Sequence, residues 1–512
     1  MGRSVMAFGA LALLAALLAG LSLVAPLSHD ESQYLAAAKL TADWRPYADF
    51  LHLQTPLQIY IFASLLELAG NHVLLPLRLA TAVCGAGTLA FVYLTQRRLG
   101  VEARLALLCA VLLAFNGPFL FGATVVRNDA LPALLEAASI AAAACAFGSA
   151  SRRRRMWLWF LAAALLALAA SAKISYLLPL AALGLFHVLR YVRREAGALR
   201  EAVASAAGAA LGLLPIFLAR ASAPEAFDYG VFHYAMQAPF DWYGSSGAGH
   251  RLTLPFKLWD VAKALASGPA AVALVFLAFR RWWGRGSPQA AGEAERLADF
   301  LILAGLAAAL LPTPTWPQYV VPLLPPLFVR LGLELSRRQP GRALRTKLAG
   351  VFLLTALVGL IQPTGWLLPG AGKSTPIVAT REARWIGDRM RANHASGSIS
   401  TLSPQIVLDS GFLLDRRFAA GPFFYRTGDG VPPERQRRLQ AVSPSTLASF
   451  LDEAPPAAIV TGYETDSRGR DLDAPLRAYA ESRGYRAERS PFGKAILHLA
   501  PARPRSRSGE AN

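Results

Sequence analysis

The chain has 512 residues, of which 54% are hydrophobic and 17% charged, and its mean hydropathy is +0.36. This composition argues against a soluble protein and predicts a polytopic membrane protein. The formal net charge of +19 does not indicate nucleic-acid binding, because the arginines fall in short clusters between apolar stretches, as in the cytoplasmic loops of membrane proteins. The three cysteines lie inside apolar stretches without CxxC spacing, which excludes a disulfide framework and a zinc cluster.

A helix needs about 20 residues to cross a bilayer, and eleven apolar stretches qualify as candidate spans. They occupy roughly 6–27, 73–95, 103–122, 130–148, 156–172, 174–190, 202–219, 259–279, 297–312, 316–334 and 348–368. If the N-terminus is cytoplasmic, alternate connections carry the arginine clusters, as the positive-inside rule requires. Those clusters are Arg97 with Arg98 and Arg104, the run 152–155, Arg190 to Arg200, Arg280 to Arg285, and Arg337 to Lys347. The other connections and the C-terminal residues then lie on the outer face.

Two apolar segments allow a second interpretation. The segment TPLQIYIFASLLELAG (55–70) is short and has Pro56 as its second residue. If it spanned the membrane, the arginine clusters would no longer fall on the same side. We expect it to form an amphipathic or re-entrant helix within a long outer loop at 28–72, with a twelfth span as the alternative. We expect the first stretch to be retained as a membrane-spanning helix, and the alternative is a signal peptide that is cleaved off.

The composition changes after Leu368. PGAGKSTP is rich in turn-forming residues and predicts a linker, so we expect a membrane module at 1–370 followed by a separate domain at 371–500. In that domain TREARWIGDRM and LDAPLRAYAESRGY predict helices, whereas SISTL, AAIVTGY and KAILHLA predict strands. The expected fold is therefore an all-α membrane protein with an outer C-terminal α/β domain. Residues 501–512 are predicted to form a disordered tail.

Charged residues at the outer ends of the spans are candidates for a functional site, because ionisable groups near a membrane are costly unless they are used or paired. Asp30 and Glu31 follow the first span in PLSHDESQYL, and Arg127 and Asp129 lie at the mouth of another span in RNDALPALL. Lys173 lies between two apolar runs at the same predicted boundary. The plainer alternatives are acids that end a helix in water and a lysine that marks the interface.

Aromatic residues accompany these charges. Arg251 follows the aromatic loop FHYAMQAPFDWYGSSGAGH, and Trp316 and Tyr319 stand at another outer helix mouth in TWPQYVVPLL. Aromatic rings anchor helices at the membrane interface and also stack on sugar rings, so both interpretations stay open.

In this order, the segments HDESQYL, HLQTPLQIYIFASLLELAG, LRLATAVCGAGTLAFVYLTQRRLG, RNDALPALL, AKISYLLPL and PQYVVPLLPPL resemble the GT-C class of integral-membrane glycosyltransferases. Within that class the chain is most similar to the protein O-mannosyltransferase and aminoarabinose-transferase group. The resemblance covers roughly residues 6–334 and implies a GT-C fold. It also implies inverting transfer of a sugar from a polyprenyl-phosphate donor to a lipid, polysaccharide or protein acceptor on the outer face.

The resemblance assigns roles to individual residues. It makes Asp30 the catalytic base, with Glu31 and Asp129 as further catalytic acids that orient the acceptor or hold a cation. The donor phosphate would be bound by Arg127, Lys173 and Arg251. The expected substrate-binding residues are Tyr34, His52, Gln54, Trp316 and Tyr319.

Two positions depart from the family pattern and affect the expected contacts with the donor. Aminoarabinose transferases carry a lysine where this chain has Gln54, and an arginine where it has Gln33. No cofactor or metal site is expected, although carboxylates at a water-filled mouth are compatible with a divalent cation.

Other classes of function remain as alternatives. A flippase or transporter would also have many spans, but it would place charges near the bilayer midplane and contain internal repeats. In this sequence the acidic residues lie at one predicted surface, and no internal repeat is detected. A non-catalytic assembly subunit is the third alternative. The expected partners are the lipid-linked donor, its acceptor and membrane lipids, with no nucleic acid. Ala-rich spans and an excess of Arg over Lys predict a bacterial inner membrane, with a cytoplasmic N-terminus and a periplasmic C-terminal domain.

Overall fold

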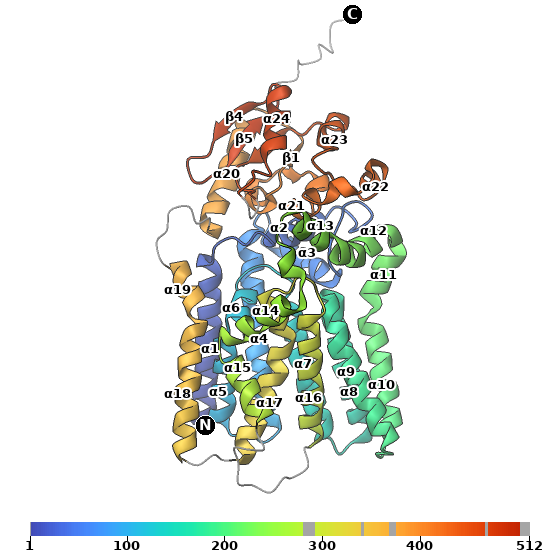
Figure 1. The fold of residues 1–512 in the computed structure, drawn as a ribbon, viewed down its shortest axis with the longest axis vertical. Coiled ribbons are helices and arrows are strands. Elements are labelled where there is room, and N and C mark those ends of the chain that lie inside the picture. The colour runs from blue at the N-terminus through green and yellow to red at the C-terminus, as the bar shows by residue number, and fades with distance from the viewer. Residues whose placement is uncertain (1, 280–291, 339–341, 368–374, 466–468, 502–512) are drawn as a thin grey trace, which may run out of the picture. The chain divides into compact units, whose positions relative to one another are not determined.

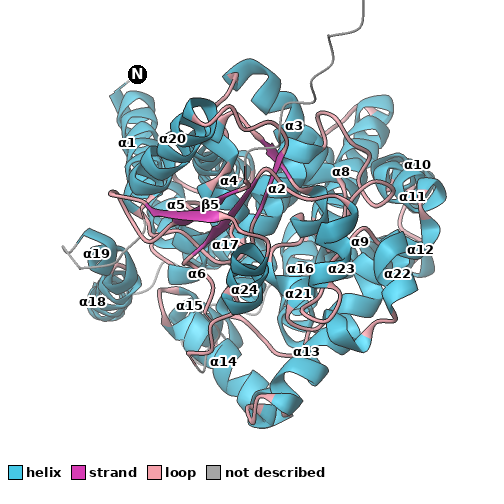
Figure 2. Cartoon of the chain, turned by 90° about the horizontal axis from the view of Figure 1, so that it is seen from above, coloured by secondary structure: helices cyan, strands magenta, loops and turns pink. Residues whose placement is uncertain are grey.

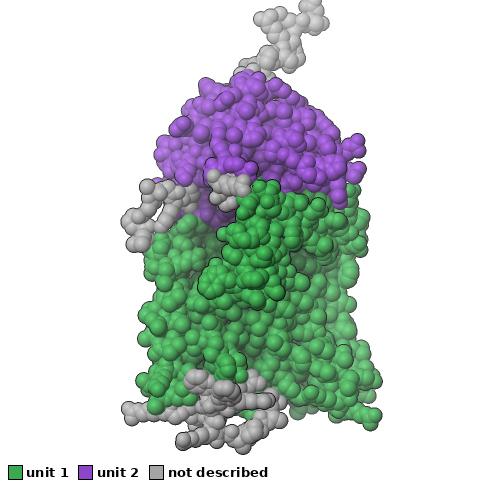
Figure 3. Space-filling view, in the orientation of Figure 1, with its two compact units in different colours: residues 1–26, 53–62, 75–371 green, residues 27–52, 63–74, 372–512 purple. Residues whose placement is uncertain are grey.

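The computed structural model of the protein describes residues 2–279, 292–338, 342–367, 375–465 and 469–501. The chain forms two compact units. The first, here the helical unit, comprises residues 1–26, 53–62 and 75–371, and the second, the mixed unit, comprises residues 27–52, 63–74 and 372–512 (Figure 3). The basic loop at 280–285, most of the expected linker and residues 502–512 lie outside the described residues.

The helical unit contains the apolar helices (Figure 1). They are α1 (Gly2–Val24), α4 (Leu74–Arg98), α5 (Ala103–Ala114), α6 (Gly117–Gly122), α7 (Ala130–Phe147), α8 (Arg152–Ala172), α9 (Leu177–Val192), α10 (Ala198–Gly212), α11 (Leu214–Ser222), α12 (Pro224–Asp228), α13 (Tyr234–Ser245), α14 (Leu254–Ala266), α15 (Ala270–Ala278), α16 (Glu293–Leu310), α17 (Leu324–Arg338), α18 (Arg342–Gly359) and α19 (Ile361–Leu367). In the described part of the chain, eight helical segments are long and apolar enough to cross a membrane, or nine if one bent pair counts as a span.

Eight of the eleven expected spans correspond to these eight segments, and two others are broken. The remaining one, at 297–312, lies in α16, which is not among the eight segments because charged residues occupy its first turns. The stretch at 259–279 forms α14 and α15, which meet at an angle of 104°. The stretch at 103–122 forms α5 and α6, separated by Asn116, whose side chain donates to the carbonyl oxygens of Leu112 (2.8 Å) and Leu113 (3.0 Å) and accepts from the N–H of Ala270 (3.0 Å). One asparagine therefore satisfies backbone groups at both breaks, which explains how interrupted helices are tolerated here.

The segment at 55–70 forms α3 (Leu57–Ala69), which has 13 residues and is too short to span a bilayer as a helix. The buried guanidinium of Arg78 on α4 donates to the carbonyl oxygens of Ser22 (2.9 Å), Ala25 (2.6 Å) and Pro26 (3.1 Å). These carbonyls end α1 without partners in the helix, so Arg78 caps α1 and fixes the point at which the chain leaves it.

Helices α8 and α10 pack closely through small residues. A Cβ atom on Gly208 would lie 2.1 Å from the carbonyl oxygen of Phe160, and one on Gly212 would lie 2.4 Å from that of Ala164. Small residues allow backbones to approach in this way when lipid supplies no hydrophobic drive for helices to associate. The hydroxyl of Ser171 also donates to the Gly212 carbonyl oxygen at 2.7 Å.

We therefore expect Gly208→Ala to destabilise the protein by about 1–3 kcal/mol, because the clash is with backbone that cannot rotate away. Gly184 on α9 is the matched control, since a Cβ there meets no atom within 4 Å. Thermal unfolding of the purified protein in detergent measures both variants. Equal stabilities for Gly208→Ala and Gly184→Ala would contradict the close packing of α8 on α10.

The mixed unit contains α2 (Glu31–Leu40) and a small domain with a five-stranded sheet (Figure 2). Its remaining elements are α20 (Pro376–Ala392), β1 (Ser398–Ser400), β2 (Leu413–Leu414), α21 (Pro422–Tyr425), α22 (Pro433–Arg438), α23 (Leu447–Glu453), β3 (Ala458–Thr461), α24 (Ala474–Ser482), β4 (Arg486–Arg489) and β5 (Ile496–Leu499). The strand order is β2-β1-β3-β5-β4, in which β1 is parallel to β2 and β3, and β5 is antiparallel to β3 and β4.

The three expected strands and two expected helices of this domain are present as β1, β3, β5, α20 and α24. Strand β4 was not expected, because its sequence RAER shows no apolar residues at alternate positions, and it lies at the edge of the sheet where few side chains are buried. Helix α2 is buried over nine of its ten residues and packs on the short helices at 404–406 and 408–410. The acidic pair therefore begins a helix that is anchored in this unit.

Candidate functional site

The helical unit holds a buried cluster of three charges. Asp129 is the residue that precedes α7, and one of its carboxylate oxygens accepts from Arg127 Nε at 3.1 Å. The other oxygen accepts from Lys173 Nζ, which lies between α8 and the turn that begins α9. All three side chains are buried, with 8% exposure or less. Two cations therefore share the carboxylate of Asp129.

Polar and aromatic residues surround this cluster. Lys173 Nζ lies 5.1 Å from the centre of the Tyr319 ring, which provides a cation–π contact. Asn128 donates to Gln54 Oε1 at 2.8 Å, and Gln58 donates to the carbonyl oxygen of Arg127 at 3.2 Å. The segment around Gln54 is thus hydrogen-bonded to the loop that carries Arg127 and Asp129.

The third expected phosphate ligand lies apart from these contacts. The Arg251 guanidinium stands 6.0 Å from the centre of the Trp316 ring. Within the described residues of the helical unit, no ion pair joins Arg251 to Asp129. The structure therefore joins Arg127, Asp129, Lys173, Tyr319 and, through Asn128, Gln54. Arg251 and Trp316 form a second pair, in which Trp316 is exposed and Arg251 is half-buried.

The acidic pair belongs to the mixed unit, and its two members differ. Glu31 is fully buried, and its Oε2 accepts from the backbone N–H of Ser28 at 2.8 Å while its own N–H donates to the Ser28 carbonyl oxygen at 3.0 Å. These two contacts close the turn that leads into α2, and the first of them is the Glu-to-backbone half of a capping box. Asp30 is only half-buried. Asp30 is therefore the more accessible carboxyl group, and Glu31 shapes the turn that presents it.

The residue before this pair is held by the C-terminal part of the same unit. His29 Nδ1 lies 3.0 Å from Glu464 Oε2, and the His29 ring makes an edge contact with Phe423 at 5.0 Å between ring centres. Glu464 Oε1 accepts from the Ser403 hydroxyl at 2.5 Å. His29 belongs to the segment HDESQYL, but sequence reasoning missed its partners, because they are far apart along the chain.

The loop at 462–464 that carries Glu464 is itself fixed by a buried carboxyl group. Asp473 Oδ2 accepts from the backbone N–H groups of Gly462 (2.7 Å), Tyr463 (3.1 Å) and Glu464 (3.2 Å). Burial raises the pKa of Asp473 to about 6, and the nearby charge of Glu464 adds to this rise, although the three N–H groups oppose it.

Asp473 gives a pH-dependent prediction for this loop. Its folded pKa of about 6 exceeds the ordinary 3.8, so the folded loop binds more protons than the unfolded loop and becomes more stable as the pH falls through 6. We expect the protection of its amides from hydrogen exchange, corrected for intrinsic rates, to rise by about tenfold between pH 7 and pH 5. Exchange mass spectrometry measures this, and Asp473→Asn should abolish the pH dependence. A wild-type loop with equal protection at both pH values would contradict the raised pKa.

Two further expected substrate residues lie in the mixed unit. Tyr34 is on α2 and is buried, with 4% exposure. His52 is also buried, with 2% exposure, and its ring makes an edge contact with Tyr47 at 5.8 Å between centres. Across the described part of the chain, no three His, Cys, Asp or Glu side chains gather closely enough to hold a metal ion.

The sequence of the chain was compared with models of protein families and with curated proteins. Residues 60–222, which include the Arg127, Asp129 and Lys173 cluster, match the family model of dolichyl-phosphate-mannose-protein mannosyltransferases. No curated protein matches the chain.

Solved structures resemble the chain over most of its length. ArnT from Cupriavidus metallidurans matches in the apo state with a TM-score of 0.64 at 15% identity, and bound to undecaprenyl phosphate with a TM-score of 0.61 at 16% identity. Both matches cover 96% of this chain and 98% of ArnT. An oligosaccharyltransferase from Archaeoglobus fulgidus, in complex with Zn and sulfate, matches with a TM-score of 0.53 at 13% identity, over 96% of this chain and 73% of the other.

Proposed function

We propose, on the premise that this chain has the GT-C fold of membrane glycosyltransferases, that it transfers a sugar from a polyprenyl-phosphate donor to an acceptor hydroxyl. The fold was expected from the sequence and is confirmed by the likeness to ArnT. The match to mannosyltransferases and the apolar helices support the coarser statement that the chain is a multi-pass membrane glycosyltransferase.

The observation that carries the proposal is the buried cluster of Arg127, Asp129 and Lys173. Burying charges is costly, and Arg127 and Lys173 both bind the one carboxylate of Asp129, so this buried site offers two neighbouring cations to a phosphate group. A purely structural ion pair would need only one cation. ArnT has been solved with undecaprenyl phosphate, which supports a lipid phosphate as the anion.

Each residue of the cluster then has a distinct role in binding the donor. We assign Arg127 and Lys173 to the donor phosphate, and Asp129 to holding both cations in place, since each of its oxygens receives one of them. Tyr319 beside Lys173 would contact the sugar or its phosphate. Arg251 and Trp316 form a cation–π pair that would provide a second, more exposed contact.

The reaction needs only one group that accepts a proton. A polyprenyl phosphate leaves with the bonding electron pair and is stable as an anion, so a general acid is not required. We assign the base to Asp30, because Glu31 is committed to the Ser28 N–H. Asp30 would take the proton from the acceptor hydroxyl as its oxygen attacks the anomeric carbon opposite the phosphate, which inverts that carbon. Cationic character on the sugar would be stabilised by nearby carboxylates, as in glycoside hydrolysis.

We also assign supporting roles to Gln54, Tyr34 and His52 and propose the membrane face at which the reaction takes place. Gln54 would order the loop of Arg127 through Asn128, whereas buried Tyr34 and His52 would support the segment that presents Asp30. The clusters of arginine in alternate connections support a cytoplasmic N-terminus and chemistry at the periplasmic face of a bacterial inner membrane. The acceptor would be a lipid, a glycan or a protein of the cell envelope.

Mass spectrometry of a deletion strain tests the proposal. Loss of the chain should remove one sugar from an envelope lipid, polymer or protein, and the corresponding polyprenyl-phosphate sugar should accumulate. Restoring the wild-type chain should reverse both changes. If the donor instead accumulates only on the cytoplasmic face of the membrane, the chain acts as a flippase and the proposed transfer is wrong.

A further inference from the structure

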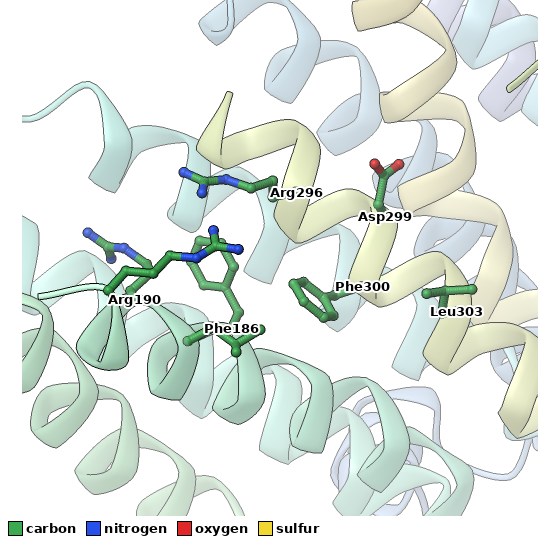
Figure 4. A pocket seen from close by; sticks show the side chains of 8 residues that line it. Phe186, Arg190, Arg296, Asp299, Phe300 and Leu303 are labelled. Atoms are coloured by element: carbon green, nitrogen blue, oxygen red, sulfur yellow. The ribbon is translucent and has the colours of Figure 1, made fainter. Parts of the chain in front are cut away.

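A cavity of about 230 Å³ opens between the end of α9 and the beginning of α16 in the helical unit. Figure 4 shows Arg190 and Arg296 reaching into it from these two helices, with the rings of Phe186 and Phe300 beside them. The cavity is also lined by Leu189, Arg193, Asp299 and Leu303. Because α9 begins just after Lys173 and runs away from it, the cavity lies at the opposite end of this span from the charge cluster.

Some of the charges that line the cavity are already neutralised. Arg190 Nε donates to Glu195 at 2.7 Å, and its Nη1 donates to Glu201 at 2.6 Å. Asp299 accepts from Arg330 Nε at 3.0 Å. Glu293 also lies 3.7 Å from Arg190. The carboxylates near the cavity are therefore engaged with arginines, so they offer little to a positively charged ligand.

Two guanidinium groups remain for a ligand. Arg193 is exposed, and among the described residues it has no ion-pair partner. Arg296 lies near two carboxylates, Glu195 at 3.8 Å and Glu293, but its buried Nε has no hydrogen-bond partner among the described residues. A buried N–H without an acceptor is costly, which indicates that an acceptor from outside the chain completes this site.

The opposite side of the cavity is apolar and faces outward from the helices. Phe300 and Leu303 are on α16, and Leu303 is 64% exposed. Leu185 and Val188 on α9 do not line the cavity but are also about half exposed, at 48% and 55%. Since α9 is part of a candidate span, these side chains would contact lipid hydrocarbon. The cavity therefore combines an apolar floor open to acyl chains with a cationic rim.

We propose that this cavity binds an anionic phospholipid, with an acyl chain against Phe300 and Leu303 and the phosphate on Arg193 and Arg296. A free soluble anion would use the arginines but not the apolar floor. A zwitterionic lipid would bring its ammonium group towards two guanidinium groups, which repel it. Basic pockets between membrane helices bind acidic headgroups through the same combination of charge and hydrocarbon contact. This proposal does not depend on the proposed transferase activity.

The test is native mass spectrometry of the purified full chain in detergent, titrated with phosphatidylglycerol or phosphatidylcholine of the same acyl chains. We expect wild type to retain phosphatidylglycerol preferentially. The Arg193→Ala/Arg296→Ala variant should lose this preference by about thirtyfold, since each cation near an acidic headgroup is worth roughly fivefold in affinity. The Arg193→Lys/Arg296→Lys variant, which keeps both charges, should retain most of it and shows that the site still folds.

The matched control is Arg153→Ala/Arg154→Ala, which removes two exposed arginines at the beginning of α8 that do not line the cavity. It should bind phosphatidylglycerol like wild type. An equal loss in the control would show general surface attraction and overturn the proposal. Equal binding of the two lipids, or displacement of phosphatidylglycerol by glycerol phosphate at similar concentration, would overturn it as well, the latter in favour of a soluble anion.

Discussion

Asp30→Asn is expected to leave the protein inserted and folded but to reduce the rate of sugar transfer by about 10²–10⁴-fold, the contribution of a positioned general base. The amide has the same shape as the carboxyl group and cannot accept the proton of the acceptor hydroxyl. Because Asp30 is only half-buried and the amide fills the same space, the change should cost little stability. Binding of the donor, which we assign to Arg127 and Lys173, should be unchanged.

Initial rates with purified protein, its polyprenyl-phosphate sugar and the acceptor identified in the deletion strain provide the measurement. Asp43→Asn is the matched control, because Asp43 is an exposed acid just beyond the same helix. It should keep wild-type rates. An Asp30→Asn protein whose rate lies within threefold of wild type would remove Asp30 as the base.

Glu31→Gln separates the two members of the acidic pair. The amide keeps an oxygen that can accept from the Ser28 N–H, so the capping contact weakens without disappearing. We expect a loss of transfer of roughly tenfold or less, well below that of Asp30→Asn, since Glu31 would act only through the position of Asp30. Equal losses in the two variants, at equal stability, would instead favour a direct role for Glu31.

The support of α2 by the C-terminal domain gives that domain a role in the proposed reaction. Glu464 contacts His29, Ser403 contacts Glu464, and Asp473 fixes the backbone of their loop. The residue next to the proposed base is therefore held by a network that starts in the strand-and-helix domain. A domain without catalytic groups of its own would still affect the rate by ordering Asp30.

The sequence predicted the long helices well, because an apolar run of sufficient length has few alternatives in a membrane. The expected span at 130–148 is the helix Ala130–Phe147, and the one at 174–190 is the segment Ile174–Val192. The break at Asn116 was missed, because averaging over a whole apolar stretch hides one polar residue. The role of Asn116 also depends on Ala270, a distant residue whose N–H donates to the Asn116 side chain.

The candidate site was predicted as a set of residue types on one membrane face, without their pairing. Nothing in the sequence indicates that Asp129 receives both Arg127 and Lys173, since Lys173 comes from a later helix end. Similarly, no local pattern indicates that His29 contacts Glu464, because a glutamate after a strand is common. Contacts between distant segments are set by packing of the whole chain, which local patterns do not encode.

The charge cluster allows structural and functional roles to be separated by two substitutions. Asp129→Asn leaves Arg127 and Lys173 buried next to each other without their shared carboxylate. Breaking a buried pair in this way should destabilise the protein by about 3–5 kcal/mol.

Lys173→Met instead leaves Asp129 paired with Arg127, which balances their charges, so we expect near-wild-type stability. The same variant removes one proposed phosphate ligand and should weaken donor binding by about tenfold or more, the worth of a charged hydrogen bond.

Thermal unfolding in detergent and binding of polyprenyl phosphate, measured on the same preparations, distinguish these outcomes. The surface pair of Lys263 and Asp260 (2.7 Å) is the matched control, and Asp260→Asn should cost at most about 1 kcal/mol. If Lys173→Met bound polyprenyl phosphate as tightly as wild type, Lys173 would be only a structural partner of Asp129.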